Sequence, residues 1–211
     1  MEDLAQYLIY IPIPQSINQQ FEQWNSYINS KYHNTYKTYV DGKWSAHLMI
    51  YLSPMPAENV SKIMQQTELI ASTLTSFEVE FDQFTSKPDG FVFMETTPKS
   101  KQLLENIHTK FVEALLPYRD GKIKSKYLER WDNFSDKEKK NIETKGIPYD
   151  YEPHITVAKV DPSELNIAYQ DLVTTYNAAF SFEVDQINIL RFENGINTVL
   201  GKFMFKSLST K

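Results

Sequence analysis

The chain has 211 residues, of which 41% are hydrophobic and 23% charged, with a net charge of −5 at pH 7. This acidic balance excludes a non-specific coat protein for nucleic acid, because such proteins are strongly basic. The absence of Cys excludes disulfides and thiolate metal sites, and no apolar run approaches the roughly 20 residues that cross a bilayer. The acidic start Met1-Glu2-Asp3-Leu4 is unlike a signal peptide. We therefore expect a cytoplasmic protein with no membrane partner.

The first half of the chain predicts a strand, a helix, a second strand, a second helix and a hairpin. Alternation predicts a buried strand over residues 5–13, and Ser16 can cap a helix whose apolar residues recur at three- and four-residue spacing over 17–28. A strand over 46–52 carries His47, and an apolar stripe over 60–71 predicts the next helix. The hairpin joins strands over 77–84 and 91–96 through Lys87-Pro88-Asp89-Gly90.

The second half repeats this order but contains one insertion. Apolar residues over 103–115 predict a helix, and a strand over 152–159 carries His154. The sequence Asp161-Pro162-Ser163-Glu164 is typical of a helix start, and a last hairpin joins residues 180–192 and 197–205. The charged insertion over 117–150 holds the capping box Ser135-Asp136-Lys137-Glu138, which predicts a short helix. A loop of this length serves either as a lid or binding loop, or as a solvated surface excursion.

The two halves match in motif order as well as in element order. Ser76-Phe77-Glu78-Val79 begins 29 residues after His47, and Ser181-Phe182-Glu183-Val184 begins 27 residues after His154. A duplicated unit tends to build one pseudo-symmetric site. The alternative is that two generic strand–helix–strand units resemble each other by accident.

The two histidine strands supply groups for acid–base chemistry. Side chains alternate along a strand, so His154 and Thr156 point the same way and place an imidazole beside a hydroxyl. Two such imidazoles across a cleft provide a neutral base and a protonated acid near neutral pH, and a hydroxyl can bind a phosphate oxygen. The spacing of His47 and His154 is unlike a metal-ligand motif, and no Gly-rich phosphate loop is present. The pattern favours phosphodiester transfer without a metal or cofactor.

At these residues the chain resembles the two-histidine (2H) phosphoesterases, which include 2′-5′ RNA ligase-like proteins and 2′,3′-cyclic nucleotide phosphodiesterases. The resemblance lies in the opening strand, both histidine strands and the sequence Pro153-His154-Ile155-Thr156-Val157. It implies an α+β, bilobal and pseudo-symmetric fold, with two antiparallel-rich sheets flanked by helices around a central cleft. The whole chain would form one domain, with lobe-forming halves at about 1–97 and 98–211. By the same resemblance, His47 and His154 are the catalytic acid and base, and Thr156 binds phosphate.

The first histidine strand departs from the family pattern of His-x-Thr/Ser. Met49 stands where a hydroxyl residue is expected, and a thioether cannot donate a hydrogen bond. By alternation, Ser45 or Tyr51 could supply the missing hydroxyl. Three outcomes remain open: an active enzyme with a rebuilt phosphate site, altered substrate choice, or a lobe that only binds.

Further candidates lie beside the histidine strands. Trp44, Tyr149 and Tyr151 are positioned either to stack on a nucleotide base or to pack against the lobe rim. Four basic residues of the insertion either attract phosphate or form a solvated face: Lys122, Lys124, Lys126 and Arg130. We expect His33 and His108 to be structural or exposed rather than catalytic.

The function expected from these observations is a metal-independent phosphodiesterase. Its partner would be a 2′,3′-cyclic phosphate end, or a 2′-5′-linked, 3′-5′-linked or cyclic oligonucleotide, bound by a monomer. The alternatives are a non-catalytic module that binds a nucleotide or an RNA end, and a protein-interaction domain that keeps only the fold.

Overall fold

Strands form where buried and half-buried residues alternate, and helices form where buried residues recur every three or four positions. The computed structural model describes residues 5–36, 46–193 and 196–206. The strands are β1 (Gln6–Pro12), β2 (His47–Pro54), β3 (Phe77–Ser86), β4 (Phe91–Thr96), β5 (His154–Lys159), β6 (Phe180–Val184), β7 (Gln186–Glu193) and β8 (Ile196–Met204). The helices are α1 (Gln15–Lys31), α2 (Val60–Thr73), α3 (Pro98–Leu115), α4 (Ser125–Leu128), α5 (Asp136–Lys145) and α6 (Leu165–Thr175).

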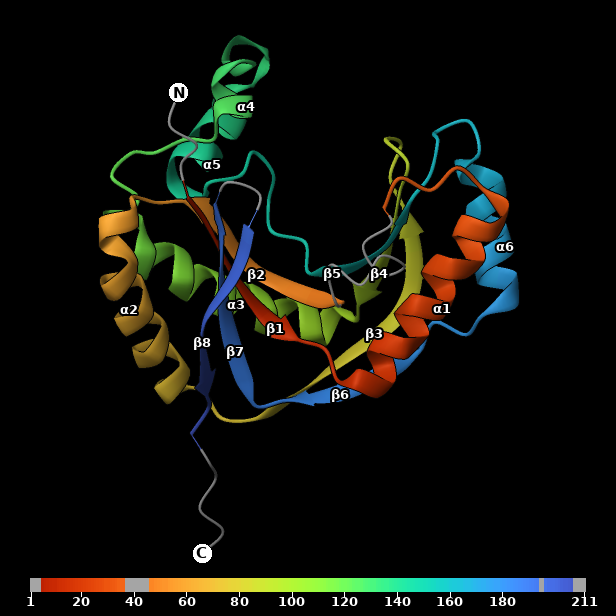
Figure 1. Cartoon of the computed structure of the whole chain (residues 1–211), viewed down its shortest axis with the longest axis horizontal. Coiled ribbons are helices and arrows are strands. Elements are labelled where there is room, and N and C mark those ends of the chain that lie inside the picture. The colour runs from red at the N-terminus through yellow and green to blue at the C-terminus, as the bar shows by residue number, and fades with distance from the viewer. Residues whose placement is uncertain (1–4, 37–45, 194–195, 207–211) are drawn as a thin grey trace, which may run out of the picture.

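The described strands form two antiparallel sheets of four strands each (Figure 1). The first sheet has the order β2-β1-β7-β8, and the second has the order β5-β4-β3-β6. This architecture confirms the predicted α+β class with two antiparallel sheets. The sheets do not coincide with the sequence halves at 1–97 and 98–211, because each sheet takes two strands from each half. The strand predicted over 180–192 divides at Asp185, where the chain passes from the second sheet to the first.

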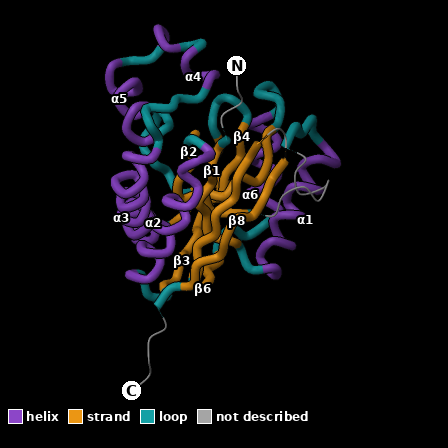
Figure 2. The backbone as a smooth tube through the Cα atoms, turned by 60° about the vertical axis from the view of Figure 1, so that its left-hand side comes forward, coloured by secondary structure: helices purple, strands orange, loops and turns teal. Residues whose placement is uncertain are grey.

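Each sheet is covered on its outer face by two helices. Figures 1 and 2 show α2 and α3 on one side of the strands and α1 and α6 on the other. The connections cross between the sheets. Helix α1 follows β1 of the first sheet but contacts β5 of the second, whereas α3 follows β4 of the second sheet but contacts β2 of the first. Each histidine strand therefore packs against a helix from the other half of the chain.

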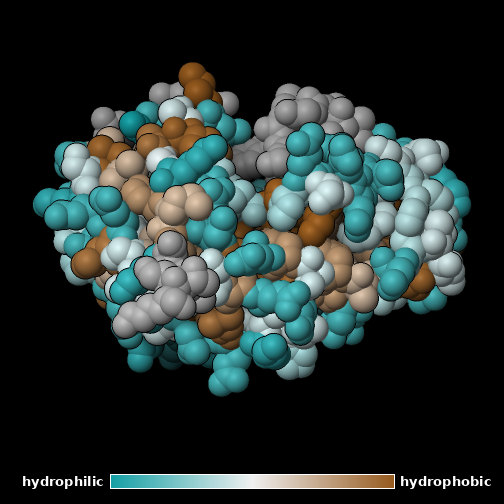
Figure 3. Space-filling view, turned by 90° about the horizontal axis from the view of Figure 1, so that it is seen from below, coloured by the Kyte–Doolittle hydropathy of each residue, from teal (hydrophilic) through white to brown (hydrophobic). Residues whose placement is uncertain are grey.

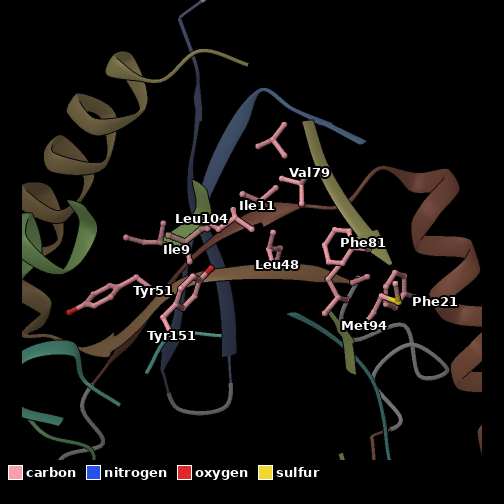
Figure 4. Packing of buried hydrophobic residues seen from close by; sticks show 14 of the residues in the cluster. Ile9, Ile11, Phe21, Leu48, Tyr51, Val79, Phe81, Met94, Leu104 and Tyr151 are labelled. Atoms are coloured by element: carbon pink, nitrogen blue, oxygen red, sulfur yellow. The ribbon is translucent and has the colours of Figure 1, made fainter. Parts of the chain in front are cut away.

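The core is one continuous cluster that includes residues of both sheets. Figure 4 shows Leu48 of β2 between Ile9 and Leu104 on one side and Phe81 and Met94 on the other. All five side chains are at most 1% exposed. Hydrophilic side chains cover most of the face seen in Figure 3, with apolar ones in small groups between them.

Two of the predicted helix starts differ from the structure. The cap residue of α1 is Pro14, whose φ of −54° already suits a helix, and Ser16 lies inside the first turn. Helix α6 begins at Leu165, because the Asp161 carboxylate accepts bonds from the Ser163 amide (2.8 Å) and hydroxyl (2.5 Å) and so closes a separate turn. The buried stripe of α1 is nevertheless the one that the spacing predicted, and that of α6 matches except at Tyr176, which the spacing also predicts in the stripe but which follows the helix and is half-buried.

A buried arginine connects the beginning of the insertion over 117–150 to the helix near its end. The predicted capping box starts α5: the Ser135 hydroxyl accepts from the Glu138 amide, and the Glu138 carboxylate accepts from the Ser135 amide. Arg119, only 1% exposed, donates from Nη1 to the Glu143 carbonyl (2.6 Å) and from Nη2 to the Ile142 carbonyl (2.9 Å). Its guanidinium thus satisfies the Glu143 carbonyl in the last turn of α5 and gives a second bond to the Ile142 carbonyl, which also accepts from the Gly146 amide (3.0 Å).

The turn of the β3–β4 hairpin requires glycine at position 90. Gly90 has φ +94°, and a Cβ there would lie 2.1 Å from the Val160 carbonyl oxygen. Gly121 offers a matched control, since its φ is +64° and nothing lies within 4 Å of an added Cβ. We expect Gly90→Ala to lower the free energy of unfolding by about 2–4 kcal/mol and Gly121→Ala by about 1 kcal/mol, measured by urea denaturation. Equal losses in the two variants would contradict the predicted contact.

Candidate active site

The two histidine strands meet at the centre of the molecule. β2 is the edge strand of the first sheet and β5 is the edge strand of the second, and the two strands contact each other (Figure 1). His47 begins β2 and His154 begins β5. Both imidazoles are half-buried, as are Met49 and Thr156 two positions further on. The fold therefore gives the two strands equivalent places at the junction between the sheets.

Each histidine strand contains one extra residue at the same position. Along β1, Ile9 pairs with Tyr51 but the next residue, Tyr10, pairs with Met49, so Ile50 has no partner in the ladder. Along β4, Val92 pairs with Ala158 and Phe93 with Thr156, so Val157 is left out in the same way. Ile50 and Val157 each lie three positions after their histidine. Both strands then show the same sequence of half-buried and buried side chains over their first five residues. The predicted internal repeat thus extends to these β-bulges.

The first bulge corrects the expectation for Tyr51. Simple alternation places Tyr51 on the face of His47 and Met49, but an extra residue reverses the alternation beyond it. The Tyr51 side chain is 1% exposed and belongs to the buried cluster (Figure 4). It is therefore unavailable to phosphate. Ser45 and Trp44 lie outside the described residues.

A hollow of about 610 Å³ opens beside the two strands. This central hollow is lined by Met49, Lys87, Asp89, Phe91, Phe93, Ile147, Tyr149, Asp150, Tyr151, Glu152, His154 and Thr156. Met49 and Thr156 occupy equivalent positions on the two strands, so the hollow is lined by one residue of the first motif, Met49, and by two of the second, His154 and Thr156. His47 is not one of its lining residues, and the approach of both imidazoles to one phosphate stays a prediction.

The orientation of His154 is fixed by its own backbone. Its Nδ1 lies 2.7 Å from the Glu152 carbonyl oxygen. Because a carbonyl only accepts, Nδ1 carries the proton in the neutral ring, and Nε2 is left as the base. The Phe93 ring lies 3.9 Å away between centroids. Burial lowers the pKa of His154 below 6.5, against smaller opposing effects of the Glu152 carbonyl and the nearby Glu95 carboxylate.

Each histidine has an aromatic neighbour that the sequence reading missed. The Tyr10 ring meets the His47 ring edge-on, with centroids 5.8 Å apart, and Phe93 covers His154. Tyr10 and Phe93 are equivalent, because each pairs across its sheet with the residue two positions after the histidine. Only the strand pairing identifies them, since both resemble ordinary strand residues in the sequence.

The two tyrosines before β5 have different surroundings. Tyr149 lines the central hollow with 62% of its surface exposed, so its ring is accessible to a ligand. Tyr151 is 6% exposed; its hydroxyl donates to the Met49 carbonyl (2.7 Å) and its ring stacks on His108 at 4.2 Å. We therefore interpret Tyr151 as a residue that connects this segment to β2, instead of a base-stacking residue. His108 is 5% exposed, so of the two expectations for it, structural or exposed, the exposed one is excluded.

Lys87 is the one lysine or arginine among the described residues that line the central hollow. It forms an ion pair with Glu152 (3.0 Å). Asp150 is held by Lys137 and Lys145, which lower its pKa to about 2. A phosphate in the hollow would therefore depend on neutral donors and a protonated imidazole for its binding.

The basic residues of the insertion do not line this hollow. Lys124 is 8% exposed, and burial lowers its pKa to about 7, with Lys126 and Arg119 acting in the same direction. In the described part of the chain, no three His, Asp or Glu side chains come together in a way that could hold a metal ion. None of the described helices has the length and apolar character of a membrane span.

The surroundings of His154 predict a measurable tautomer and titration. Burial disfavours the imidazolium, so His154 should bind its proton only at a pH below its ordinary value of about 6.5 and be neutral at pH 7. In ¹H–¹⁵N NMR of the folded protein, we expect the Nδ1-protonated tautomer and a midpoint below that of the same residue in urea. An Nε2-protonated ring, or a midpoint above the urea value, would contradict this geometry.

Residues 13–196 match the model of the family described as the 2′-5′ RNA ligase superfamily. No curated protein matches the sequence. In fold, the chain is similar to TT0787 of Thermus thermophilus (TM-score 0.62, 11% identity, covering 96% of this chain and 99% of that one). It is also similar to E. coli LigT complexed with 3′-AMP (TM-score 0.59, 15% identity, 97% and 99% covered). The chain therefore belongs to the 2′-5′ RNA ligase superfamily, the two-histidine phosphoesterases that act on phosphodiesters of RNA and nucleotides.

Proposed function

We propose that the protein is a metal-independent phosphodiesterase in which His154 and His47 act as base and acid on a nucleotide phosphodiester. The observation that carries the proposal is the state of His154, whose Nδ1–H is fixed by the Glu152 carbonyl and whose neutral form is favoured by burial. A positioned base of this kind contributes about 10²–10⁴-fold to a rate. Thr156 and Met49 border the same hollow, which supports a phosphate bound between the two strands.

In the proposed step, His154 Nε2 takes a proton from a water molecule or a ribose hydroxyl as that oxygen forms a bond to phosphorus. The bond from phosphorus to the leaving oxygen breaks, and His47 in its protonated form gives that oxygen a proton. The Thr156 hydroxyl donates to a non-bridging oxygen. The buried Tyr51 cannot reach it, so of the two hydroxyls considered for the β2 side only that of Ser45 could take the place left by Met49.

A nucleotide suits the size and lining of the central hollow. Its volume of about 610 Å³ lies in the range of roughly 300–1,000 Å³ that is usual for small-molecule sites. Exposed Tyr149 supplies a ring for a base at the rim, where stacking contributes about 1–3 kcal/mol. E. coli LigT, which shares the fold, has been crystallised with 3′-AMP and with ATP. We propose a 2′,3′-cyclic phosphate end, or a 2′-5′-linked, 3′-5′-linked or cyclic oligonucleotide, as the substrate of a cytoplasmic monomer.

The second candidate function is a module that binds a nucleotide or an RNA end without cleaving it. Met49 favours this alternative, because the first motif lacks the phosphate donor that Thr156 supplies in the second. Binding would then survive replacement of either histidine, and no substrate would be turned over.

Turnover of a panel of cyclic phosphates and oligonucleotides should persist in EDTA. We expect a bell-shaped dependence of kcat/KM on pH, because one imidazole must be neutral and the other protonated. His154→Ala and His47→Ala should each lower kcat/KM by at least about 10²-fold. Loss of turnover in EDTA that returns with Zn²⁺ or Mn²⁺ would favour a metallohydrolase instead, and binding without any turnover would favour the second candidate.

The two equivalent motif positions should respond differently to substitution. Thr156→Val should lower kcat/KM by about one to two orders of magnitude, since a hydrogen bond to a charged group contributes about 1.5–3 kcal/mol. Met49→Thr should leave turnover unchanged or raise it by adding a donor. Tyr51→Phe is the matched control, because its hydroxyl lies in the core and its removal should leave KM unchanged. If Thr156→Val alters neither turnover nor affinity, the phosphate lies elsewhere.

A further inference from the structure

The bulges of the two histidine strands each leave a backbone carbonyl that the hydrogen bonds of the sheets do not satisfy. An extra residue has no partner across its ladder, and a strand at a sheet edge has no neighbour on its other side. Ile50 of β2 and Val157 of β5 are such residues, and both are buried. A buried carbonyl without a partner is costly, so each must be satisfied by a side chain or by water.

Two buried side chains meet this requirement in the same way. His108 of α3 places Nδ1 2.7 Å from the Ile50 carbonyl oxygen, and Asn25 of α1 donates from Nδ2 to the Val157 carbonyl oxygen at 2.7 Å. His108 is 5% exposed and Asn25 is 0% exposed. Because the Ile50 carbonyl only accepts, His108 Nδ1 carries its proton. Both donors are the δ nitrogen, one atom beyond Cγ, so two different residue types offer an N–H donor at the same distance along the side chain.

The two contacts are reciprocal between the halves of the chain. Helix α1 belongs to the first half and holds the bulge of β5, while α3 belongs to the second half and holds the bulge of β2. On the β2 side there is a second bond, since the Tyr151 hydroxyl donates to the carbonyl of Met49, the residue before the bulge. Tyr151 stacks on His108 with ring planes 4° apart, so the two donors support each other.

We propose that His108 and Asn25 are positioning residues, each fixing the bulge that orients the histidine motif of the opposite half. A bulge reverses the alternation of side chains, so its place decides whether Met49 on β2, or His154 and Thr156 on β5, face the hollow or the core. The catalytic consequence rests on the proposed function, whereas the structural consequence does not.

Amide hydrogen exchange measured by NMR tests the structural part without any substrate. In His108→Leu we expect exchange at residues 49–51 to accelerate by at least about tenfold, with residues 155–158 unchanged. Asn25→Leu should show the opposite pattern, with an added effect near Tyr36, whose carbonyl Asn25 also binds. His108→Asn is the matched rescue, because it restores a δ-nitrogen donor, as found at position 25. Equal acceleration in both strands, or a change confined to the substituted helix, would overturn the proposal.

If His108→Leu fails to fold, Tyr151→Phe tests the dependence of the β2 bulge on its donors with a single atom removed. It deletes the donor to the Met49 carbonyl and keeps the ring stack. Exchange at residues 49–51 should again rise while that of 155–158 stays constant; unchanged exchange at 49–51 would mean that the bulge does not depend on these donors.

Kinetics well below the melting temperature separate positioning from bulk stability. His108→Leu and Asn25→Leu should each lower kcat by about 10- to 100-fold, since a displacement near 1 Å has that effect, with KM changed less than about threefold. His108→Asn should recover most of kcat. Lower Tm with normal kcat would reduce both residues to a structural role. An inactive wild-type protein with the expected exchange patterns would instead refute the proposed function and leave the positioning role intact.

Discussion

The architecture depends on the need of two edge strands to satisfy a backbone carbonyl that their sheets leave out. β2 and β5 meet at the junction between the sheets, and each has one extra residue three positions after its histidine. The donors to those carbonyls, His108 and Asn25, lie on helices from the opposite half that pack beside each strand. The crossing of α1 and α3 between the sheets supplies these helices. The site and the exchange of helices between the halves thus have a common physical cause.

Burial controls the chemistry of the site more than fixed charge does. Lys87 is paired with Glu152, and Asp150 is paired with two lysines from the insertion. Among the described residues that line the hollow, the one lysine or arginine side chain is thus already paired. His154, which the Phe93 ring covers, is kept neutral because burial lowers its pKa. A base that is neutral at pH 7 and has its proton fixed on Nδ1 is ready to accept a proton at Nε2.

The scaffold is symmetric, but its chemistry is not. The bulge, the aromatic neighbour and the donor from a helix recur on both strands. The residue two positions after the histidine differs, because it is Met49 on β2 and Thr156 on β5. The donors to the two bulges differ too: Asn25 binds the bulge of β5, whereas His108 binds the bulge of β2 and also stacks on Tyr151. In the proposed mechanism, such differences at equivalent backbone positions would make the two strands bind one phosphate unequally.

The sequence by itself determined the elements, the repeat and the family pattern, because hydrophobic periodicity and the two histidine motifs are local signals. It placed the hairpin turn at Gly90, the capping box at Ser135 and the strands correctly, except that residues 180–192 form two strands instead of one. The tertiary structure decided what depends on pairing between distant segments. Alternation failed at Tyr51 because a bulge forms only when β2 lies against β1. The division of strands between the sheets and the roles of Tyr10, Phe93 and Asn25 likewise arise from contacts across many residues, for which a single sequence carries no local signal.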